Sequence, residues 1–404
     1  MRVDIPSFLY NKRMTKSRRI SQRVIYVNFA PYENAGKILD YLTKTFDRVV
    51  LFSFNFHRLS DKQPKSMLTV FDQGAIVQTR RLFQTPTSPS LAFILLPIRS
   101  FVIFLQIVLH TWNITHRDKP FDYFFSANAF TAWTGNVIRS LGFVGKTIFW
   151  VWDYYPPVHE SKVVMFMRWL YWLFDKPASI RSDRVVFLNR HLSELRKNLG
   201  MLAKQSVYPI VEIGTYPPRV LPKKKIGKTV HLVYLGVLKR IQGLDLFFDA
   251  AHQIASNFPN LVLHVVGGGP DEEYFKNRAR MCPLKVVFHG YVQKESDVDK
   301  IIRYCDIGIA PYVPDKSNVM YYSDPSKIKR YLNFGLPVIT TDVFDFSSVI
   351  QKNQAGVLIP YSPLQFAKSI KTIVRKYALY HRNSWKIACT IQYKNIYKQI
   401  FDTV

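Results

Sequence analysis

At 404 residues, the chain is longer than one hydrophobic core usually supports, so its length favours two domains. Lys and Arg number 56 against 28 Asp and Glu, and the formal net charge of +28 favours anionic partners such as nucleic acid, anionic lipid or a sugar nucleotide. The three cysteines, Cys282, Cys305 and Cys389, lie far apart, which argues against a disulfide framework or a metal cluster and fits a reducing cytoplasm.

Residues 1–22 form a basic N-terminal tail. The sequence NKRMTKSRRISQR leads directly into a strand-like run, without the apolar segment that a secretory signal requires. We expect this tail to be disordered or to lie on an acidic surface.

Residues 23–215 alternate short apolar runs with segments of helical length, which is typical of parallel β–α units. Strands are predicted at 24–29, 48–54, 121–128, 146–152 and 184–189, and helices at 37–46, 132–141 and 162–173. We therefore expect a doubly wound α/β domain that binds its ligand at the carboxyl ends of the strands.

Residues 91–112 form an apolar segment long enough to span a bilayer. Pro97, Arg99 and Gln106 interrupt it, and a charge at mid-span is costly. We therefore favour a helix that packs in the domain or dips into a membrane interface over a true span.

Residues 216–228, YPPRVLPKKKIGK, are typical of an exposed linker between domains. The alternation resumes in a second α/β domain, residues 229–378. Its predicted strands are 231–236, 261–267, 285–290, 306–311 and 336–341, and its predicted helices include 244–257, 272–280, one ending at 304, and 363–377. Residues 379–404 have apolar positions at helical spacing and could pack on either domain, including by crossing back to the first.

The segment 321–341 combines a loop, a short helix and a buried strand. Asp324 is a good N-cap and Pro325 fits the first helical position, so the free N–H groups of the helix would face the loop. Ser326, Lys327 and Arg330 follow, and a helix start beside a lysine is suited to binding phosphate. Taken alone, the segment fits a capped surface helix better. Its place at the carboxyl edge of a sheet, opposite a second cationic turn, favours the phosphate site.

That second turn, from Gly236 to Gly243, places Lys239 and Arg240 where they could bind a diphosphate, although a solvated basic loop is an equal alternative. The run VVGGGPDEE lacks the last glycine of a nicotinamide-type site, because Glu272 stands there. Its glycines instead permit close approach of the backbone to a ligand. The Walker, H-E-x-x-H and G-x-S-x-G patterns do not occur in the sequence.

In the first domain, the run FWVWDYYPPVHE follows a strand and places Asp153, Tyr154 and His159 in a loop that should face the second domain. Asp153 is the candidate catalytic or acceptor-positioning residue, with a turn-capping aspartate as the alternative. Asn34 and Gly36 follow another strand and would let a substrate approach the backbone closely.

Most of residues 229–377 resemble the nucleotide-sugar-binding half of family 4 glycosyltransferases, which are two-domain enzymes of the GT-B fold. The resemblance rests on YLGVLKRIQGLDLFFDA, LVLHVVGGGP, VVFHGYV, CDIGIAPY and DPSKIKRYLNFGLPVIT, in the family's order and approximate spacing. The first half resembles the family more loosely, through WDYYPP, VVFLNRHLSELR and VEIGTYPP.

This resemblance implies two Rossmann-like domains facing a central cleft, and transfer of a sugar from a nucleotide diphosphate donor to an acceptor on the first domain. It also implies retention of configuration and no need for a metal or a cofactor. Lys239 or Arg240 would face the diphosphate, and Gly268 and Tyr291 would lie near the nucleotide. Gly236 belongs to the first of these loops, and Asp324, Ser326 and Lys327 would form the phosphate-binding helix start.

The chain departs from the family pattern at several positions. Val237 and Gln242 replace an arginine and a lysine that the family often has, and Trp152 replaces a frequent histidine. Tyr322 and Arg330 stand where two glutamates are common. Arg330 is the larger departure, because a carboxylate that would accept ribose hydroxyls becomes a donor.

We therefore expect a hexosyltransferase-type glycosyltransferase in which cations and a helix dipole neutralise the leaving diphosphate. A polysaccharide, glycolipid or lipid-linked acceptor is expected, at the cytoplasmic face of an anionic membrane. Two alternatives stay open. The net charge could indicate a nucleic-acid-binding protein, although the basic residues are scattered and lack a known nucleic-acid-binding motif, so no nucleic acid is expected. The departures from the family pattern could also indicate an inactive scaffold of glycosyltransferase shape.

Overall fold

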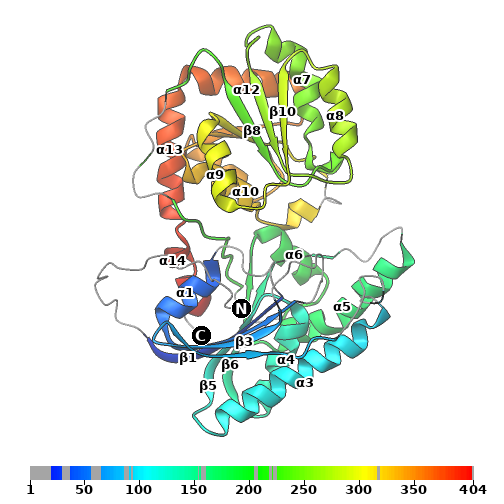
Figure 1. The fold of residues 1–404 in the computed structure, drawn as a ribbon, viewed down its shortest axis with the longest axis vertical. Helices are drawn as coiled ribbons and strands as arrows, with labels where there is room; N and C mark the ends of the chain where they lie inside the picture. The colour runs from blue at the N-terminus through cyan, green and yellow to red at the C-terminus, as the bar shows by residue number, and fades with distance from the viewer. Residues whose placement is uncertain are drawn as a thin grey trace, which may run out of the picture.

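The computed structural model describes residues 20–29, 37–55, 65–85, 91, 94–152, 154–155, 161–203, 208–217, 221, 225–315 and 319–402. Two α/β domains lie end to end along the long axis of the molecule, and each is built on its own sheet (Figure 1). The described residues leave out almost all of the predicted basic tail and parts of the linker. They also leave out the candidates Asn34, Gly36, Asp153 and His159.

The N-terminal sheet has seven strands in the order β4-β3-β2-β1-β5-β6-β7. Its parallel strands are β1 (Ile20–Phe29), β2 (Phe46–Phe54), β5 (Phe121–Ser126), β6 (Val144–Val151) and β7 (Arg184–Phe187). The sequence did not predict β3 (Met67–Asp72) and β4 (Ala75–Arg81), an antiparallel hairpin at the sheet edge. Gln73 and Gly74 at its turn both have positive φ, 50° and 78°, which suits a two-residue hairpin loop.

Helices cover both faces of this sheet. Helix α1 (Ile38–Thr45) lies on one face, next to α14 (Tyr393–Ile396) from the end of the chain (Figure 1). Residues of α15 (Lys398–Phe401) pack in the same core cluster. The other face carries α3 (Leu96–Thr115), α4 (Ala129–Ser140) and α5 (Lys162–Arg181). Helix α6 (Arg190–Asn198) follows β7 and lies near the second domain.

The C-terminal sheet is wholly parallel, in the order β10-β9-β8-β11-β12-β13. Its strands are β8 (His231–Leu235), β9 (Val262–Val266), β10 (Lys285–Gly290), β11 (Ile307–Ala310), β12 (Val338–Thr341) and β13 (Gly356–Ile359). The chain adds β9 and β10 on one side of β8 and then crosses to the other side to add β11. The topological switch point therefore lies between β8 and β11.

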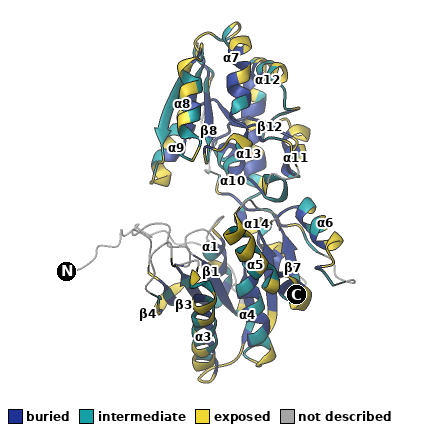
Figure 2. Cartoon of the chain, turned by 90° about the vertical axis from the view of Figure 1, so that its right-hand side faces the viewer, coloured by how far each residue is buried: buried dark blue, intermediate teal, exposed yellow. Residues whose placement is uncertain are grey.

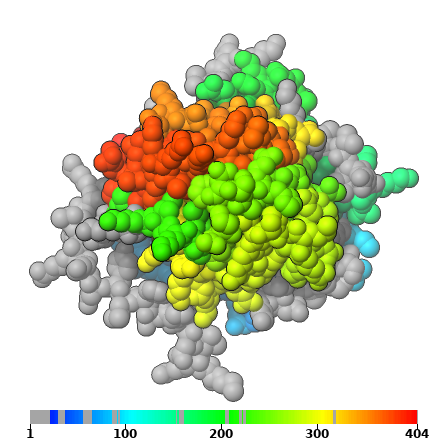
Figure 3. Space-filling model, turned by 90° about the horizontal axis from the view of Figure 1, so that it is seen from above, coloured from blue at the N-terminus to red at the C-terminus, as the bar shows by residue number. Residues whose placement is uncertain are grey.

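Six helices flank this sheet: α7 (Asp245–Ala255), α8 (Glu272–Arg280), α9 (Glu295–Tyr304), α10 (Ser326–Asn333), α11 (Phe346–Lys352) and α12 (Pro363–Arg375). Helices α7, α8 and α12 pack on one face, and α9, α10 and α11 pack on the other. Seen from above, α7 and α8, in green to yellow-green, lie beside the orange-red α12 and cover the end of the domain that points away from the N-terminal domain (Figure 3).

The end of the chain joins the two domains. Helix α13 (Tyr377–Thr390) packs on the C-terminal domain, where Nδ1 of His381 lies 2.7 Å from the carbonyl oxygen of Gly335. The backbone N–H of Tyr393 then donates to the carbonyl of Thr215, and Tyr397 and Phe401 enter the core of the N-terminal domain. One C-terminal segment thus contributes to both hydrophobic cores.

Candidate functional site

Three side chains lie together at the switch point of the C-terminal sheet. Tyr234 belongs to the end of β8, Tyr312 follows β11, and Lys327 lies in the first turn of α10. The ammonium nitrogen of Lys327 is 4.5 Å from the ring centroid of Tyr234 and 4.8 Å from that of Tyr312. Ligands of open α/β sheets bind at this position, outside the carboxyl ends of the strands.

The ammonium group of Lys327 is shielded from solvent and has no hydrogen-bond partner among the described residues. Burial lowers its pKa to about 7. A Cβ atom placed on Gly236 would lie only 3.0 Å from the lysine nitrogen, so the glycine leaves the space that this group occupies. A buried cation that contacts only aromatic rings is costly, and an anionic ligand would compensate it.

The start of α10 lies at the same edge, but its cap differs from the prediction. The helix begins at Ser326 with Pro325 at the N-cap position, so the prediction of Asp324 as the cap is wrong. Asp324 instead accepts a hydrogen bond of 2.8 Å from the backbone N–H of Ile213, in the N-terminal domain. Burial raises the pKa of Asp324 to about 6, although Lys329 opposes the shift. The exposed Ser326 and the first N–H groups of α10 therefore stay available to a phosphate.

The glycine run after β9 has a structural role that the sequence did not indicate. A Cβ atom on Gly267 would lie 2.0 Å from the carbonyl oxygen of Gly236, and one on Gly269 would lie 2.5 Å from that of Leu238. The N–H of Leu238 also donates to the carbonyl of Gly268 over 3.0 Å. In the described structure, the glycines therefore allow the loop after β9 to approach the loop after β8 closely.

The other predicted donor-side residues, Lys239, Arg240 and Tyr291, form no hydrogen bond with the ammonium of Lys327 in the described structure. Lys239 is exposed on the loop that begins at Gly236. The guanidinium of Arg240 lies 4.8 Å from the ring centroid of Tyr274, and its Nε is 3.6 Å from a carboxylate oxygen of Asp245. Tyr291 is 80 % exposed and follows the edge strand β10, two strands away from β8.

Arg330 is held by α9. Its Nε and Nη2 lie 2.9 Å and 2.8 Å from Oδ1 of Asp299, and Nη2 donates to the carbonyl of Glu295. The family pattern has a carboxylate at position 330, whereas here the arginine charge is neutralised by a carboxylate on the neighbouring helix.

Residues of the N-terminal domain contact the segment just before α10, and the sequence analysis missed most of them. The side chain of Asn189 donates to the carbonyl of Ser323 over 2.9 Å, and the ring of His191 stacks on Tyr321 with centroids 4.0 Å apart. The predicted candidate Tyr154 lies on the same boundary, 4.8 Å from Tyr322 between ring centroids. The available signal was the sequence NRH, which begins at the last residue of a predicted strand.

A buried cluster of charged side chains also links the two domains. The ammonium of Lys329, which is 2 % exposed, pairs with Glu212 of the N-terminal domain and lies 3.4 Å from Asp324. The segment that carries Lys327 is therefore fixed from both sides: by its own domain and by the N-terminal domain.

Comparisons with known proteins bear on both halves. Residues 229–376 match the family model described as "Glycosyl transferases group 1". A search of curated proteins found no significant match. Among solved structures, Anabaena HepE in complex with UDP-glucose is similar over 95 % of this chain and 99 % of its own, with a TM-score of 0.63 and 14 % identity. The chain has the GT-B fold.

Two further GT-B structures show the same similarity. Sucrose-phosphate synthase from Thermosynechococcus elongatus has a TM-score of 0.62 and 14 % identity, covering 94 % of this chain and 96 % of its own. WaaG, a glycosyltransferase involved in lipopolysaccharide biosynthesis, has a TM-score of 0.59 and 15 % identity, covering 93 % and 98 %. The prediction of a GT-B fold with two Rossmann-like domains is confirmed.

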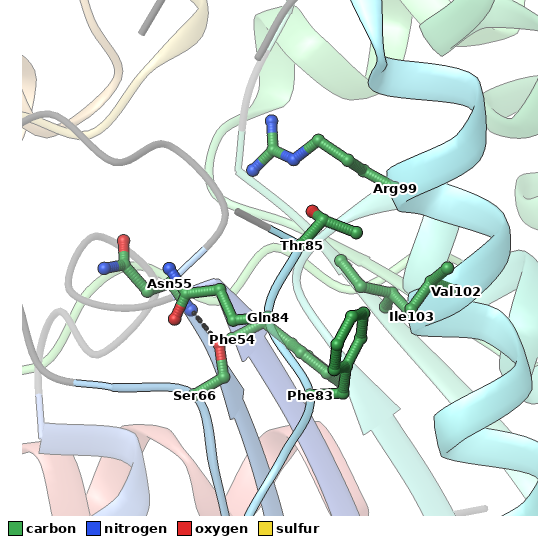
Figure 4. Close-up of a pocket in the computed structure, with 9 residues that line it drawn as sticks. All are labelled: Phe54, Asn55, Ser66, Phe83, Gln84, Thr85, Arg99, Val102 and Ile103. Carbon is green, nitrogen blue, oxygen red and sulfur yellow. Dashed lines mark hydrogen bonds between the residues drawn. The ribbon is translucent and has the colours of Figure 1, made fainter. Parts of the chain in front are cut away.

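The N-terminal half of this GT-B chain also has a pocket at the carboxyl end of β2 (Figure 4). Its polar lining includes Arg99 of α3, which is 6 % exposed, and Asn55, whose N–H donates to the hydroxyl of Ser66 over 3.0 Å. Phe54, Phe83, Gln84, Thr85, Val102 and Ile103 complete the lining. The pocket lies on the half that the family resemblance assigns to the acceptor.

Proposed function

We propose that this protein is a hexosyltransferase of the family 4 type, which moves a sugar from a nucleotide diphosphate sugar to a polysaccharide, glycolipid or lipid-linked acceptor. One observation carries the proposal: Lys327 places a buried ammonium, without a hydrogen-bond partner among the described residues, at the switch point of the domain that matches the group 1 glycosyltransferase model. The site needs a compensating anion, and a diphosphate supplies one.

In the proposed reaction, the bond between the sugar and the diphosphate breaks, and negative charge develops on the leaving phosphate oxygen. Lys327 and the N-terminus of α10 stabilise that charge, and Lys239 reaches the diphosphate from the exposed loop. The aromatic rings around Lys327 exclude water, which strengthens its electrostatic effect. We propose that transfer retains the anomeric configuration and requires neither metal nor cofactor.

The acceptor would bind against the N-terminal domain. Asp153 is proposed to position or activate the acceptor hydroxyl, with Asn34, Gly36, Tyr154 and His159 on the same side. The contact between Tyr154 and Tyr322 supports this part of the proposal, because it brings the loop after β6 to the donor-side segment. We place the enzyme in the cytoplasm, peripheral at the inner face of the membrane.

Heat protection by nucleotide sugars tests the donor site. The full chain is heated with a panel of UDP-, GDP- and ADP-sugars, in parallel with Lys327→Met and with the matched control Lys300→Met, whose lysine is 79 % exposed on α9. We expect one nucleotide class to raise the unfolding temperature of the wild type and of Lys300→Met but not of Lys327→Met. Protection of none of the three, or equal protection of all three, would refute the donor site.

Catalysis needs a separate measurement. Release of nucleotide diphosphate from the protecting donor, with and without a membrane extract as acceptor source, distinguishes an enzyme from an inactive scaffold. Donor binding without hydrolysis or transfer would support the scaffold. A gel shift with nucleic acid at physiological salt, together with no donor protection, would support the nucleic-acid alternative.

A further inference from the structure

Helices α3 and α5 leave an apolar surface exposed on one side of the N-terminal domain. On α3, the exposed residues recur at helical spacing and are between 38 and 59 % exposed: Ile98, Phe101, Leu105, Leu109 and Trp112. On α5, they are between 50 and 61 % exposed: Val163, Phe166, Trp169 and Leu173. Figure 2 looks onto this side of the domain, where α3 and α5 lie on the same face as α4. We call these nine residues the apolar face.

The two helices are packed in the domain by their opposite sides. Ile103 and Ile107 of α3 belong to the core, and the interrupting Arg99 points inward to the pocket. By length and composition α3 could cross a membrane. Only 22 % of its most apolar 18-residue stretch is buried in the protein, so α3 is not an ordinary core helix. Exposed apolar surface of this extent is unusual on a soluble monomer and marks an interaction site.

The charges around the apolar face favour one kind of partner. Helix α3 contains no Asp or Glu, and the single carboxylate of α5, Asp175, is buried in an ion pair of 2.7 Å with Arg196. Exposed basic residues lie on α5: Lys162, Lys176 and Arg181. The apolar side chains of the two helices are thus accompanied by positive charge from α5, which is complementary to an anionic lipid surface.

The strand β4 adds to this basic character. Arg80 is exposed on it and lies on the face of the sheet that α3 covers, because its cross-strand neighbour Leu68 belongs to the core cluster beneath α3. The backbone of Phe83 exchanges two hydrogen bonds with the side chain of Gln106 on α3, at 2.7 Å and 3.0 Å. Burial lowers the pKa of His110 on α3, and the nearby charge of Arg80 lowers it further. Arg80 therefore lies close to α3.

Helix α5 also connects the apolar face to the acceptor-side loop. The indole N–H of Trp172 donates to the carbonyl of Tyr155 over 3.0 Å, and Tyr171 contacts the ring of Tyr155 with centroids 4.8 Å apart. A bilayer surface bound along α5 would thus lie next to the loop that contacts Tyr322.

We propose that the apolar face inserts into the interfacial region of an anionic lipid bilayer while α3 stays packed in the domain and does not cross the membrane. The inference rests on the membrane location in the proposed function and specifies its surface and lipid class. Vesicle binding tests it without reference to sugar transfer, and donor protection is measured separately on the same variants.

Flotation of the full chain with vesicles tests this proposal. Vesicles of phosphatidylcholine alone are compared with vesicles that contain about 30 % phosphatidylglycerol, at about 0.1 M salt. The wild type should float with the anionic vesicles. The double variant Phe101→Ser/Trp169→Ser should bind them at least about tenfold more weakly, because it removes two exposed apolar anchors. The control Met281→Ser removes an apolar side chain that is 87 % exposed on the C-terminal domain and should bind like the wild type.

Two further measurements complete the test. The variant Arg80→Ser should weaken binding about fivefold at low salt and lose this difference at high salt. Alkaline carbonate should release the bound wild type, and all variants should keep the wild-type unfolding temperature and donor response.

Four results would overturn the proposal. The first is failure of the wild type to bind anionic vesicles, and the second is wild-type binding by the Phe101→Ser/Trp169→Ser variant. The third is resistance of the bound wild type to carbonate release, which would indicate a true span. The fourth is a wild-type dimer that the Phe101→Ser/Trp169→Ser substitutions dissociate. Lost donor protection with intact vesicle binding would refute the proposed function and leave the apolar face supported.

Discussion

At the scale of single residues, Lys327 combines a stability cost with the binding role that we propose for it. Its ammonium is buried against two tyrosine rings, and burial lowers its pKa to about 7 from an ordinary value of 10.5. Such a group destabilises the folded state whenever the unfolded chain holds the proton more tightly. Functional sites often retain costs of this kind.

Replacing Lys327 by Met should therefore stabilise the protein. Between pH 7 and 10.5 the unfolded state binds more protons than the folded state, so the wild type gains stability as the pH rises through this window. We expect Lys327→Met to raise the free energy of unfolding at pH 7 by about 1–3 kcal/mol, with a gain that shrinks toward pH 10. Urea unfolding at several pH values measures this, and a variant less stable than the wild type at pH 7 would contradict it.

Gly236 offers a second test at this scale. Its φ is +144°, and an added Cβ would lie 3.0 Å from the ammonium of Lys327. We expect Gly236→Ala to cost about 1–2 kcal/mol of stability and to weaken nucleotide binding. Gly142→Ala is the matched control, because Gly142 has φ +80° and nothing within 4 Å of its Cβ position. The control should lose stability without losing binding, and equal binding by both variants would count against the role of Gly236.

At the scale of elements, α10 contributes a buried lysine to the contact between the domains. Lys329 of α10 pairs with Glu212 and lies near Asp324, whose raised pKa of about 6 comes mainly from burial. Removing the lysine leaves two carboxylates without a counter-charge.

Lys329→Met should therefore lower the free energy of unfolding by about 3–5 kcal/mol. The triple variant Lys329→Met/Glu212→Gln/Asp324→Asn should recover part of this loss, because no unpaired carboxylate remains. Denaturant unfolding of both variants checks the result, and a loss below about 1 kcal/mol for Lys329→Met would show that the cluster is not coupled to stability.

Some predicted elements coincide with those of the structure. The predicted strand 285–290 coincides with β10, and the predicted helix 272–280 coincides with α8. The strand β4 escaped prediction because it is exposed along its whole length and shows no alternation. The strand β13, of four residues, and the helix α11, of seven, were also missed.

The candidate site was partly predictable for a similar reason. A lysine at a helix start beside a strand end is visible in the sequence, so Lys327 could be chosen as a candidate from the sequence. The enclosing rings of Tyr234 and Tyr312 depend on β8 and β11 being neighbours, which the local sequence does not specify. Asp324 accepts a hydrogen bond from Ile213 of the other domain, which the local sequence does not show, so the prediction of Asp324 as the helix cap was wrong. Arg330 likewise pairs with Asp299 of another helix.

At the scale of the whole molecule, the C-terminal segment holds the two domains together. Tyr397 is fully buried in the N-terminal core, where its hydroxyl accepts from the N–H of Gly214 and its ring lies 5.3 Å from that of Trp150. The period of residues 379–404 indicated helices, but the sequence could not specify which domain would bury them.

Tyr397→Ala should therefore act on the N-terminal domain. We expect a loss of about 3–5 kcal/mol, because the change leaves a cavity and an unpaired N–H. Limited proteolysis should cut the N-terminal domain of this variant faster while the C-terminal domain stays resistant. Cleavage at the wild-type rate would mean that the C-terminal helices do not stabilise that domain.

Calorimetry of nucleotide diphosphate binding tests the proposal that Lys327 binds the donor phosphates. At about pH 8 most of the Lys327 side chains are unprotonated in the free protein, and a bound diphosphate would raise their pKa. Titrations in two buffers of different ionisation enthalpy should therefore show uptake of close to one proton per nucleotide in the wild type and none in Lys327→Met, which should also bind at least about tenfold more weakly. Binding without proton uptake, or equal affinity in both proteins, would contradict the account.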